Sequence, residues 1–187
     1  MRKFTYLLSG FVFISQLAFA QGKKGDITEF ITVSYLQPKV NDLKGGGIGL
    51  TGGLLYSITD KFSFGIAAEG SLSYFNLTTA EGGGSLNAWY GGRAVGEYYL
   101  TEKKVKPFIG AGIGGLKTGS FAESSLNFSA DETTRITLGP RAGILFGNFR
   151  LSMEYSIIPQ KISSITNDYN LRFIGFHLGT HFGSSWK

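Results

Sequence analysis

The nonapeptide Phe149-Arg-Leu-Ser-Met-Glu-Tyr-Ser-Ile157 alternates strictly between apolar and polar side chains. Successive side chains of a β-strand point to opposite faces, so this stretch has one apolar face and one polar face. The apolar face carries Phe149, Leu151, Met153, Tyr155 and Ile157, and the polar face carries Arg150, Ser152, Glu154 and Ser156. Apolar side chains directed outward and charged side chains directed inward are typical of a transmembrane β-barrel.

Seven further stretches of the chain show the same alternation between turn signals. The eight expected strands span residues 28–36, 47–58, 62–75, 85–100, 105–116, 134–146, 149–157 and 169–182. Long connections (37–46, 76–84, 118–133 and 158–168) alternate with short ones (59–61, 101–104 and 147–148). Outer-membrane barrels have short periplasmic turns and longer outer loops. The chain is therefore predicted to be all-β, an eight-stranded antiparallel up-and-down transmembrane β-barrel.

The first 20 residues have the features of an export signal. Arg2 and Lys3 precede a mostly apolar segment, and Ala18-Phe19-Ala20 matches the small-x-small cleavage rule. The alternative, an N-terminal membrane anchor, is disfavoured because the apolar run is short and polar residues interrupt it. We expect residues 1–20 to be a cleaved signal peptide and residues 21–187 to be the barrel domain.

Composition excludes several classes of protein. The 18 basic and 13 acidic residues give a net charge of +5, and removal of Arg2 and Lys3 lowers it to +3. This excess is too small and too scattered to predict nucleic-acid binding. The chain has no cysteine, which excludes disulfides and cysteine-based zinc sites. Glycine, at 28 of 187 residues, is about twice as frequent as usual. This argues against a secreted β-sandwich and for a narrow lumen crossed by tilted strands.

Aromatic residues gather toward the ends of the expected strands, where a barrel places its two aromatic girdles. The set expected at the periplasmic end is Tyr56, Phe62, Phe64, Tyr98, Phe146, Phe149 and Phe182. The set expected nearer the outer end is Tyr35, Tyr74, Tyr90, Tyr155 and Tyr169.

The inward faces of the expected strands carry charges of both signs. Counted from the short turns, an upper layer comprises Glu69, Arg93, Arg141, Glu154 and His177, and a lower layer comprises Glu97, Arg150 and His181, with Arg135 nearer the outer end. Buried charges are tolerated only when they are paired. Because eight strands leave a lumen just wide enough for side chains, we predict a plugged lumen with an ion-pair network. Two alternatives remain: a narrow gated ion path, and an active site in which Glu69 or Glu154 acts as a base with His177.

Two motifs match known sites by letter only. The segments 110–115 and 47–52 fit G-x-G-x-x-G, but a dinucleotide site requires a helix directly after the glycines, and both lie within expected strands. His177 and His181 are four residues apart, which on a strand separates them by about 13 Å. They cannot chelate one metal ion together. We therefore expect no cofactor and no metal site.

Two stretches resemble a known family. Lys106-Pro-Phe-Ile-Gly-Ala-Gly-Ile-Gly114 resembles the Pro-aromatic-x-Gly-x-Gly-x-Gly strand of small OmpA- and OmpX-like outer-membrane β-barrels of Gram-negative bacteria. Phe173-Ile-Gly-Phe-His-Leu-Gly-Thr-His-Phe182 resembles their closing strand. Members of the family commonly end on an aromatic residue of the last strand. Here Gly-Ser-Ser-Trp-Lys follows Phe182, so either Phe182 or Trp186 could end that strand.

The resemblance, which covers residues 21–182, implies insertion by the outer-membrane assembly machinery and a charged interior. We expect a non-enzymatic barrel in the cell outer membrane, in contact with membrane lipid and lipopolysaccharide. Its role would be structural, or it would display its loops, chiefly residues 118–133, to an unknown extracellular partner. A small-solute or ion channel and a lipid-modifying outer-membrane enzyme remain alternatives, although the Ser-His patterns of such enzymes are not visible in the sequence.

Overall fold

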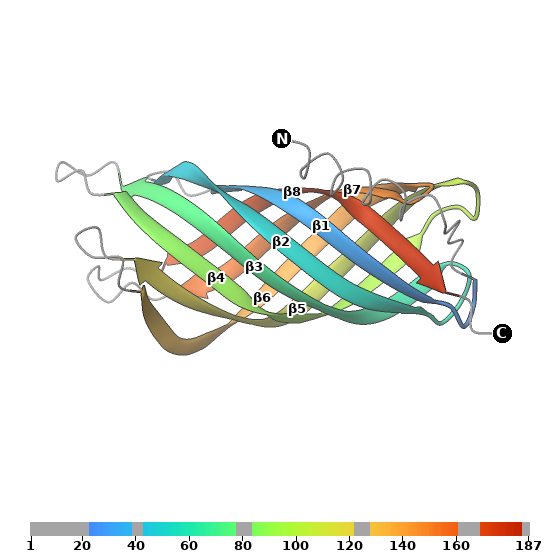
Figure 1. Cartoon of the computed structure of the whole chain (residues 1–187), viewed down its shortest axis with the longest axis horizontal. Helices are drawn as coiled ribbons and strands as arrows, with labels where there is room; N and C mark the ends of the chain where they lie inside the picture. The colour runs from blue at the N-terminus through green and yellow to red at the C-terminus, as the bar shows by residue number, and fades with distance from the viewer. Residues whose placement is uncertain (1–22, 39–42, 78–83, 122–127, 161–168, 185–187) are drawn as a thin grey trace, which may run out of the picture.

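The computed structural model describes residues 23–38, 43–77, 84–121, 128–160 and 169–184, and the structural statements below concern these residues. Eight strands form one closed barrel in which each strand pairs with the next along the chain and β1 pairs with β8 (Figure 1). All pairs are antiparallel. The strands are β1 (Ile27–Pro38), β2 (Leu43–Ser57), β3 (Phe62–Leu77), β4 (Gly84–Tyr99), β5 (Val105–Phe121), β6 (Phe128–Phe146), β7 (Phe149–Gln160) and β8 (Tyr169–Ser184).

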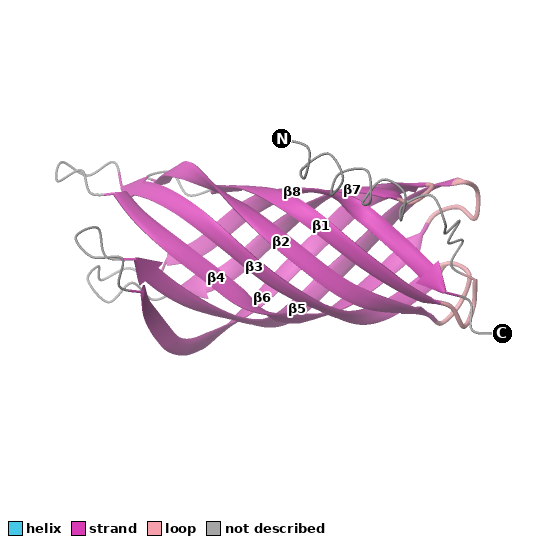
Figure 2. Ribbon diagram, viewed as in Figure 1, coloured by secondary structure: helices cyan, strands magenta, loops and turns pink. Residues whose placement is uncertain are grey.

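The described residues form strands and short connections (Figure 2). None of these segments forms a helix that is long and apolar enough to cross a membrane. The predicted all-β, eight-stranded antiparallel barrel is confirmed.

Strand pairing shows how strongly the strands are staggered. One continuous row of paired residues runs Ser57, Ser63, Glu97, Gly110, Arg141, Glu154, Gly175 and Leu36. The backbone of Ser57 is itself bonded to Asp26, so the row leaves β1 beside Asp26 and returns to it at Leu36. A stagger of this kind is required to close a sheet whose strands tilt against the barrel axis.

Apolar side chains cover the outside of the barrel, as the alternation predicted. Phe149, Leu151 and Met153 are half or more exposed, whereas Arg150 and Glu154 are buried on the opposite face of β7. The other strands follow the same rule. Exposed outward side chains include Ile31, Val33, Ile48, Leu50, Ile66, Ile113, Ile136, Phe176 and Leu178. The barrel thus presents a continuous apolar exterior and a largely polar interior.

Both aromatic girdles are present. We call the end of the barrel with residues 58–61, 100–104 and 147–148 the turn end, and the opposite end the loop end. Exposed aromatic side chains at the turn end are Tyr56, Phe62, Phe64, Tyr98, Phe146 and Phe149, and those toward the loop end are Tyr35, Tyr74 and Tyr90. Phe182 and Tyr155 are half-buried. The side chain of Tyr169 lies outside the described part.

The predicted loop boundaries were wrong at the loop end. Residues 118–121 belong to β5 and residues 128–133 to β6, so only 122–127 remain of the predicted loop 118–133. Likewise β1 reaches Pro38, β2 begins at Leu43 and β7 reaches Gln160. Alternation disappears where both faces of a strand leave the apolar layer, although the backbone pairing continues. The strict alternation of long and short loops is consequently not observed, because residues 39–42 and 58–61 are equally long connections.

Two local features settle the strand ends. Gly147 has a φ of 56°, a conformation that favours glycine, and it allows β6 to turn into β7 within two residues. The last strand continues past Phe182 to Ser184, which pairs with Ile27 of β1. Trp186 and the predicted signal peptide lie outside the described residues.

Candidate functional site

Six charged side chains in the lumen form one chain of ion pairs in which acids and bases alternate. Its order is Glu69, Arg93, Glu154, Arg141, Glu97 and Arg150. The chain crosses the lumen and connects β3, β4, β6 and β7. These six residues are among the eight that the sequence placed in the predicted lumen network. Three carboxylates and three guanidinium groups make the chain electrically neutral, which is the condition under which buried charge is tolerated.

Glu97 is the most heavily bonded member of the chain. Its side chain is fully buried and accepts a 2.9 Å hydrogen bond from Nη1 of Arg141 and a 3.1 Å bond from Nη1 of Arg150. Arg150 also donates through Nη2, so this pair is bidentate. The Tyr99 hydroxyl donates a further bond of 3.2 Å. Bidentate pairs between arginine and a carboxylate are among the strongest in proteins, and they fix both groups in position.

Two phenyl rings enclose the guanidinium group of Arg150. Its Cζ atom lies 4.5 Å from the ring centroid of Phe108 and 4.9 Å from that of Phe30. A guanidinium group between aromatic faces gains cation–π attraction while its edge remains free to bond Glu97. Phe108 lies in the Pro-aromatic-x-Gly motif of β5, so the motif supplies one wall for this arginine.

Glu154 links the upper members of the chain. It accepts hydrogen bonds from Nη1 of Arg93 and, at 3.3 Å, from Nη2 of Arg141. The Ser156 hydroxyl donates a third bond of 2.6 Å. Glu69 bonds only Arg93 within the described residues, and its side chain is 17% exposed against 2% for Glu154. The carboxylate of Glu69 is therefore the terminal and most exposed carboxylate of the ion-pair chain.

Apolar clusters lie on both sides of the ion pairs, and the sequence reasoning missed them. Toward the loop end, Trp89, Leu116, Ile158 and Phe173 pack together, with Leu36 against them. The Trp89 and Phe173 rings meet edge to face at a centroid distance of 5.7 Å. Toward the turn end, two clusters comprise Phe30, Leu55, Ala67 and Val95, and Tyr99, Phe108 and Leu145. The sequence signal that could have predicted these clusters is a large apolar residue at an inward position of a strand, as at Trp89 and Val95 on β4.

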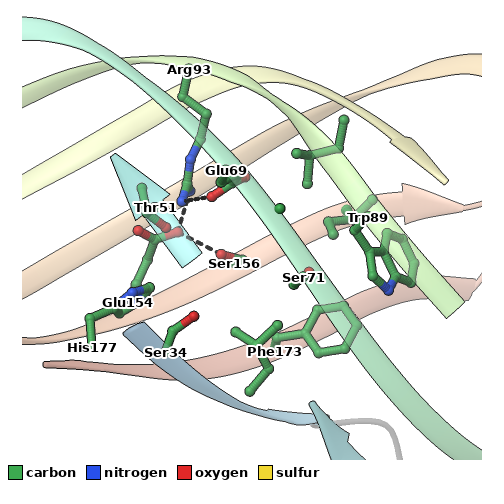
Figure 3. A pocket seen from close by; sticks show the side chains of 14 residues that line it. Ser34, Thr51, Glu69, Ser71, Trp89, Arg93, Glu154, Ser156, Phe173 and His177 are labelled. Atoms are coloured by element: carbon green, nitrogen blue, oxygen red, sulfur yellow. Dashed lines mark hydrogen bonds and ion pairs between the residues drawn. The ribbon is translucent and has the colours of Figure 1, made fainter. Parts of the chain in front are cut away.

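A cavity of about 50 Å³ lies between the ion pairs and the loop-end cluster (Figure 3). Arg93, Glu69, Glu154 and Ser156 form its polar side, and Trp89 and Phe173 face them. Since a water molecule needs about 10–15 Å³ of such volume, the cavity has room for only a few waters or a ligand of similar size.

The two predicted histidines lie on the inward face of β8. His177 lines the cavity, and its strand neighbours are Ser34 of β1 and Ser152 of β7. His181 is buried nearer the turn end, opposite Phe30. No group of three His, Cys, Asp or Glu side chains in the described segments could hold a metal ion.

Inward glycines make room for the charged side chains. A Cβ atom at Gly114 would lie 2.6 Å from Cα and 2.7 Å from Cγ of Arg93. At Gly139 a Cβ atom would run into the carboxylate of Glu154. The glycines at 110 and 114 therefore serve close packing inside a strand, and the rest of β5 follows them instead of the helix that a dinucleotide site requires.

No protein-family model matches the chain, and no curated protein matches it. Among solved structures, the outer membrane protein OprG from Pseudomonas aeruginosa superposes with a TM-score of 0.58 at 12% identity, over 89% of this chain and 99% of that chain. Neisserial surface protein A (NspA) superposes with a TM-score of 0.54 at 17% identity, over 86% and 97%. At such low identity the likeness shows the fold alone. This chain has the fold of small eight-stranded outer-membrane barrels, as its two motifs suggested.

Proposed function

We propose that this chain is an integral outer-membrane protein with a charged, closed lumen, and that its role is structural or surface-interacting and not catalytic. One observation carries the proposal. A neutral chain of six side chains joined by five ion pairs lies between apolar clusters, so side chains fill most of the described lumen, while large apolar side chains cover most of the exterior. A lumen filled in this way favours a structural role in the membrane over the transport of solutes.

Several parts of the proposal concern the setting of the barrel. Residues 1–20 act as a cleaved signal peptide, and the assembly machinery of the outer membrane inserts residues 21–187. The exposed apolar side chains contact lipid, and the loop end contacts lipopolysaccharide and the exterior. The hairpin formed by β5 and β6 is the candidate contact surface for an extracellular partner, because this pair of strands continues to Phe121 and Phe128.

Location and folding can be tested together. Cell fractionation should place the protein with outer-membrane markers, and unboiled samples should migrate differently from boiled ones on a gel. Mass spectrometry of the mature protein should show Gln21 as its first residue. Recovery of the protein in the soluble periplasmic fraction, without detergent, would refute the proposal.

A narrow channel is the second candidate, because the cavity beside Arg93 is polar on one side. Planar-bilayer recordings distinguish the two functions. We expect no steady conductance from the wild-type protein, since the ion pairs and apolar clusters block the lumen. Conductance that changes in Arg93→Ala but not in Lys117→Ala, which alters an exposed residue of β5, would establish the channel instead.

A lipid-modifying activity is the third candidate. Mass spectrometry of lipid A from cells with and without the protein tests it directly. Unchanged lipid A is the expected result. A new or missing acyl chain that depends on Glu154 or His177 would replace the structural role by an enzymatic one.

A further inference from the structure

Six lysines gather on one side of the turn end. Lys23 and Lys24 precede β1, Lys61 ends the β2–β3 turn, Lys103 and Lys104 lie in the β4–β5 turn, and Lys106 lies at the start of β5. We call these six residues the basic crescent. All are exposed except Lys106, which is half-buried, with its Nζ atom 5.9 Å from the ring centroid of Tyr99.

Direct contacts hold the segments of the basic crescent side by side. The backbone N–H of Lys24 donates a 2.8 Å hydrogen bond to Oδ1 of Asp60 in the β2–β3 turn. Nζ of Lys61 lies 3.8 Å from Oε1 of Glu102 in the β4–β5 turn. The backbone N–H of Tyr99 donates to the carbonyl of Lys61 at 2.7 Å. The two turns and the segment before β1 that carry the five exposed lysines thus lie side by side, whereas Lys106 shares the inward face of β5 with the buried Phe108.

The acids within this surface do not neutralise it. Asp26 and Asp60 accept backbone N–H bonds from Lys23 and Lys24, and Glu102 faces Lys61. Even when Glu29 on the outer face of β1 is counted, six lysines stand against four acids. The β6–β7 turn, Gly147-Asn148, carries no charge. Among the described residues of the turn end, the excess positive charge therefore lies on one arc of the barrel.

The basic crescent lies directly beyond the apolar band. Lys61 is followed by Phe62, whose exposed ring belongs to the turn-end girdle, and Lys103 and Lys104 lie between the exposed Leu100 and Val105. Aromatic girdles mark the level of the lipid headgroups. Long lysine side chains at this level extend their ammonium groups into the phosphate layer.

We propose that the basic crescent binds the phosphates of anionic phospholipids in the periplasmic leaflet. The proposal rests on the proposed function, since it requires membrane insertion with the turn end in the periplasm. Lysine is a point charge that binds phosphate without demanding bidentate geometry, which suits mobile headgroups. Each lysine near such a surface contributes about a fivefold gain in affinity. Peptidoglycan, an anionic polymer of the periplasm, fits less well because the basic crescent lies against the apolar band.

Native mass spectrometry of the folded protein in detergent micelles tests the proposal. The protein is titrated with phosphatidylglycerol and with phosphatidylcholine of the same acyl chains. We expect preferential retention of phosphatidylglycerol, and on the order of a 10- to 30-fold weaker affinity for it in Lys103→Gln/Lys104→Gln. The matched control is Lys117→Gln/Arg172→Gln, which removes two exposed charges nearer the loop end and should leave the preference unchanged.

Each result of these experiments either supports or overturns the lipid site. Equal retention of both lipids by the wild-type protein overturns the proposal, as does an undiminished preference in Lys103→Gln/Lys104→Gln. Binding to purified peptidoglycan that depends on Lys103 and Lys104, without a lipid preference, assigns the surface to the glycan and also overturns it. Heat-shift assays in liposomes report insertion separately. Failure to insert therefore removes the proposed function, whereas failure in the titration removes only the lipid site.

Discussion

Arg141 on β6 donates a 2.9 Å hydrogen bond across the lumen to Glu97 on β4. This contact joins the upper ion pairs around Arg93 and Glu154 to the lower pair of Glu97 and Arg150. Arg141 therefore bridges the two layers that the sequence separated, and the lumen is held by one network instead of two rings.

Glu97→Gln should destabilise the barrel strongly. The change leaves the buried guanidinium group of Arg150 without its carboxylate and leaves Arg141 with Glu154 alone. Loss of one partner of a buried pair costs about 3–5 kcal/mol. Urea unfolding in detergent, followed by the gel shift between folded and unfolded forms, gives the free energy of unfolding. Glu102→Gln is the control, because its exposed pair with Lys61 contributes at most about 1 kcal/mol. Equal effects of the two substitutions would contradict the network.

Gly114→Ala and Gly92→Ala should differ in sign or size. A Cβ atom at Gly114 collides with Arg93 inside the lumen, which costs about 1–3 kcal/mol by overpacking. A Cβ atom at Gly92 points outward, and its nearest neighbour, the carbonyl oxygen of Ala67, is 3.6 Å away. Alanine there should be neutral or stabilise by up to about 1 kcal/mol, because glycine is costly within a strand. The same urea assay measures the free energy of unfolding of both variants. If Gly114→Ala does not lower it, the packing around Arg93 in the lumen is less tight than the structure shows.

The fluorescence of Trp89 should report the loop-end cluster. The chain has two tryptophans, so Trp186→Phe leaves Trp89 as the only indole. Its side chain is buried, and its Nε1–H donates a 2.7 Å bond to Oγ of Ser73. We expect blue-shifted emission and weak quenching by acrylamide. Phe173→Ala should increase the quenching, whereas Phe176→Ala on the outward face should not. Strong acrylamide quenching of Trp89 in the Trp186→Phe protein would contradict a loop-end cluster that excludes water.

Charge on the outside of the barrel should be costly in proportion to depth. Leu178 is an exposed outward residue in the middle of β8, and arginine at the bilayer midplane costs about 2–4 kcal/mol. Ile58 lies at the turn end, where the cost falls to about 0–1 kcal/mol. The free energy of unfolding, measured in liposomes, should therefore be clearly lower for Leu178→Arg than for Ile58→Arg. If both substitutions have the same small effect, the apolar face does not meet hydrocarbon.

Much of the fold follows from alternation alone, because the period of two assigns each side chain to a face. The inward positions of Arg93, Glu97 and Arg150 were predictable in this way, since a charged residue between outward apolar neighbours has only one face left. The ends of β5 and β6 were not predictable. Beyond the apolar layer the sequence no longer alternates between apolar and polar residues, so residues 118–121 and 128–131 carry no periodic signal although their backbones pair.

Which charged side chains pair within the lumen depends on the stagger between neighbouring strands, and this stagger cannot be read from the sequence. Glu97 pairs with Gly110 and Gly110 with Arg141, so the two charges lie in one row only because of the register between β4, β5 and β6. The apolar clusters were missed for a different reason. Alternation assigns Trp89, Val95 and Leu116 to the inward face of their strands, but it does not show which inward side chains meet across the lumen.

The pairing of β1 with β8 has a consequence for biogenesis. The strand β1 finds its second neighbour only after β8, the last of the eight to be synthesised, has reached it. Until then two strand edges lack hydrogen-bond partners, a state that hydrocarbon does not tolerate. In the proposed membrane setting, a barrel that lacks its last strand is therefore unstable, because closure by β8 is what satisfies the two remaining strand edges.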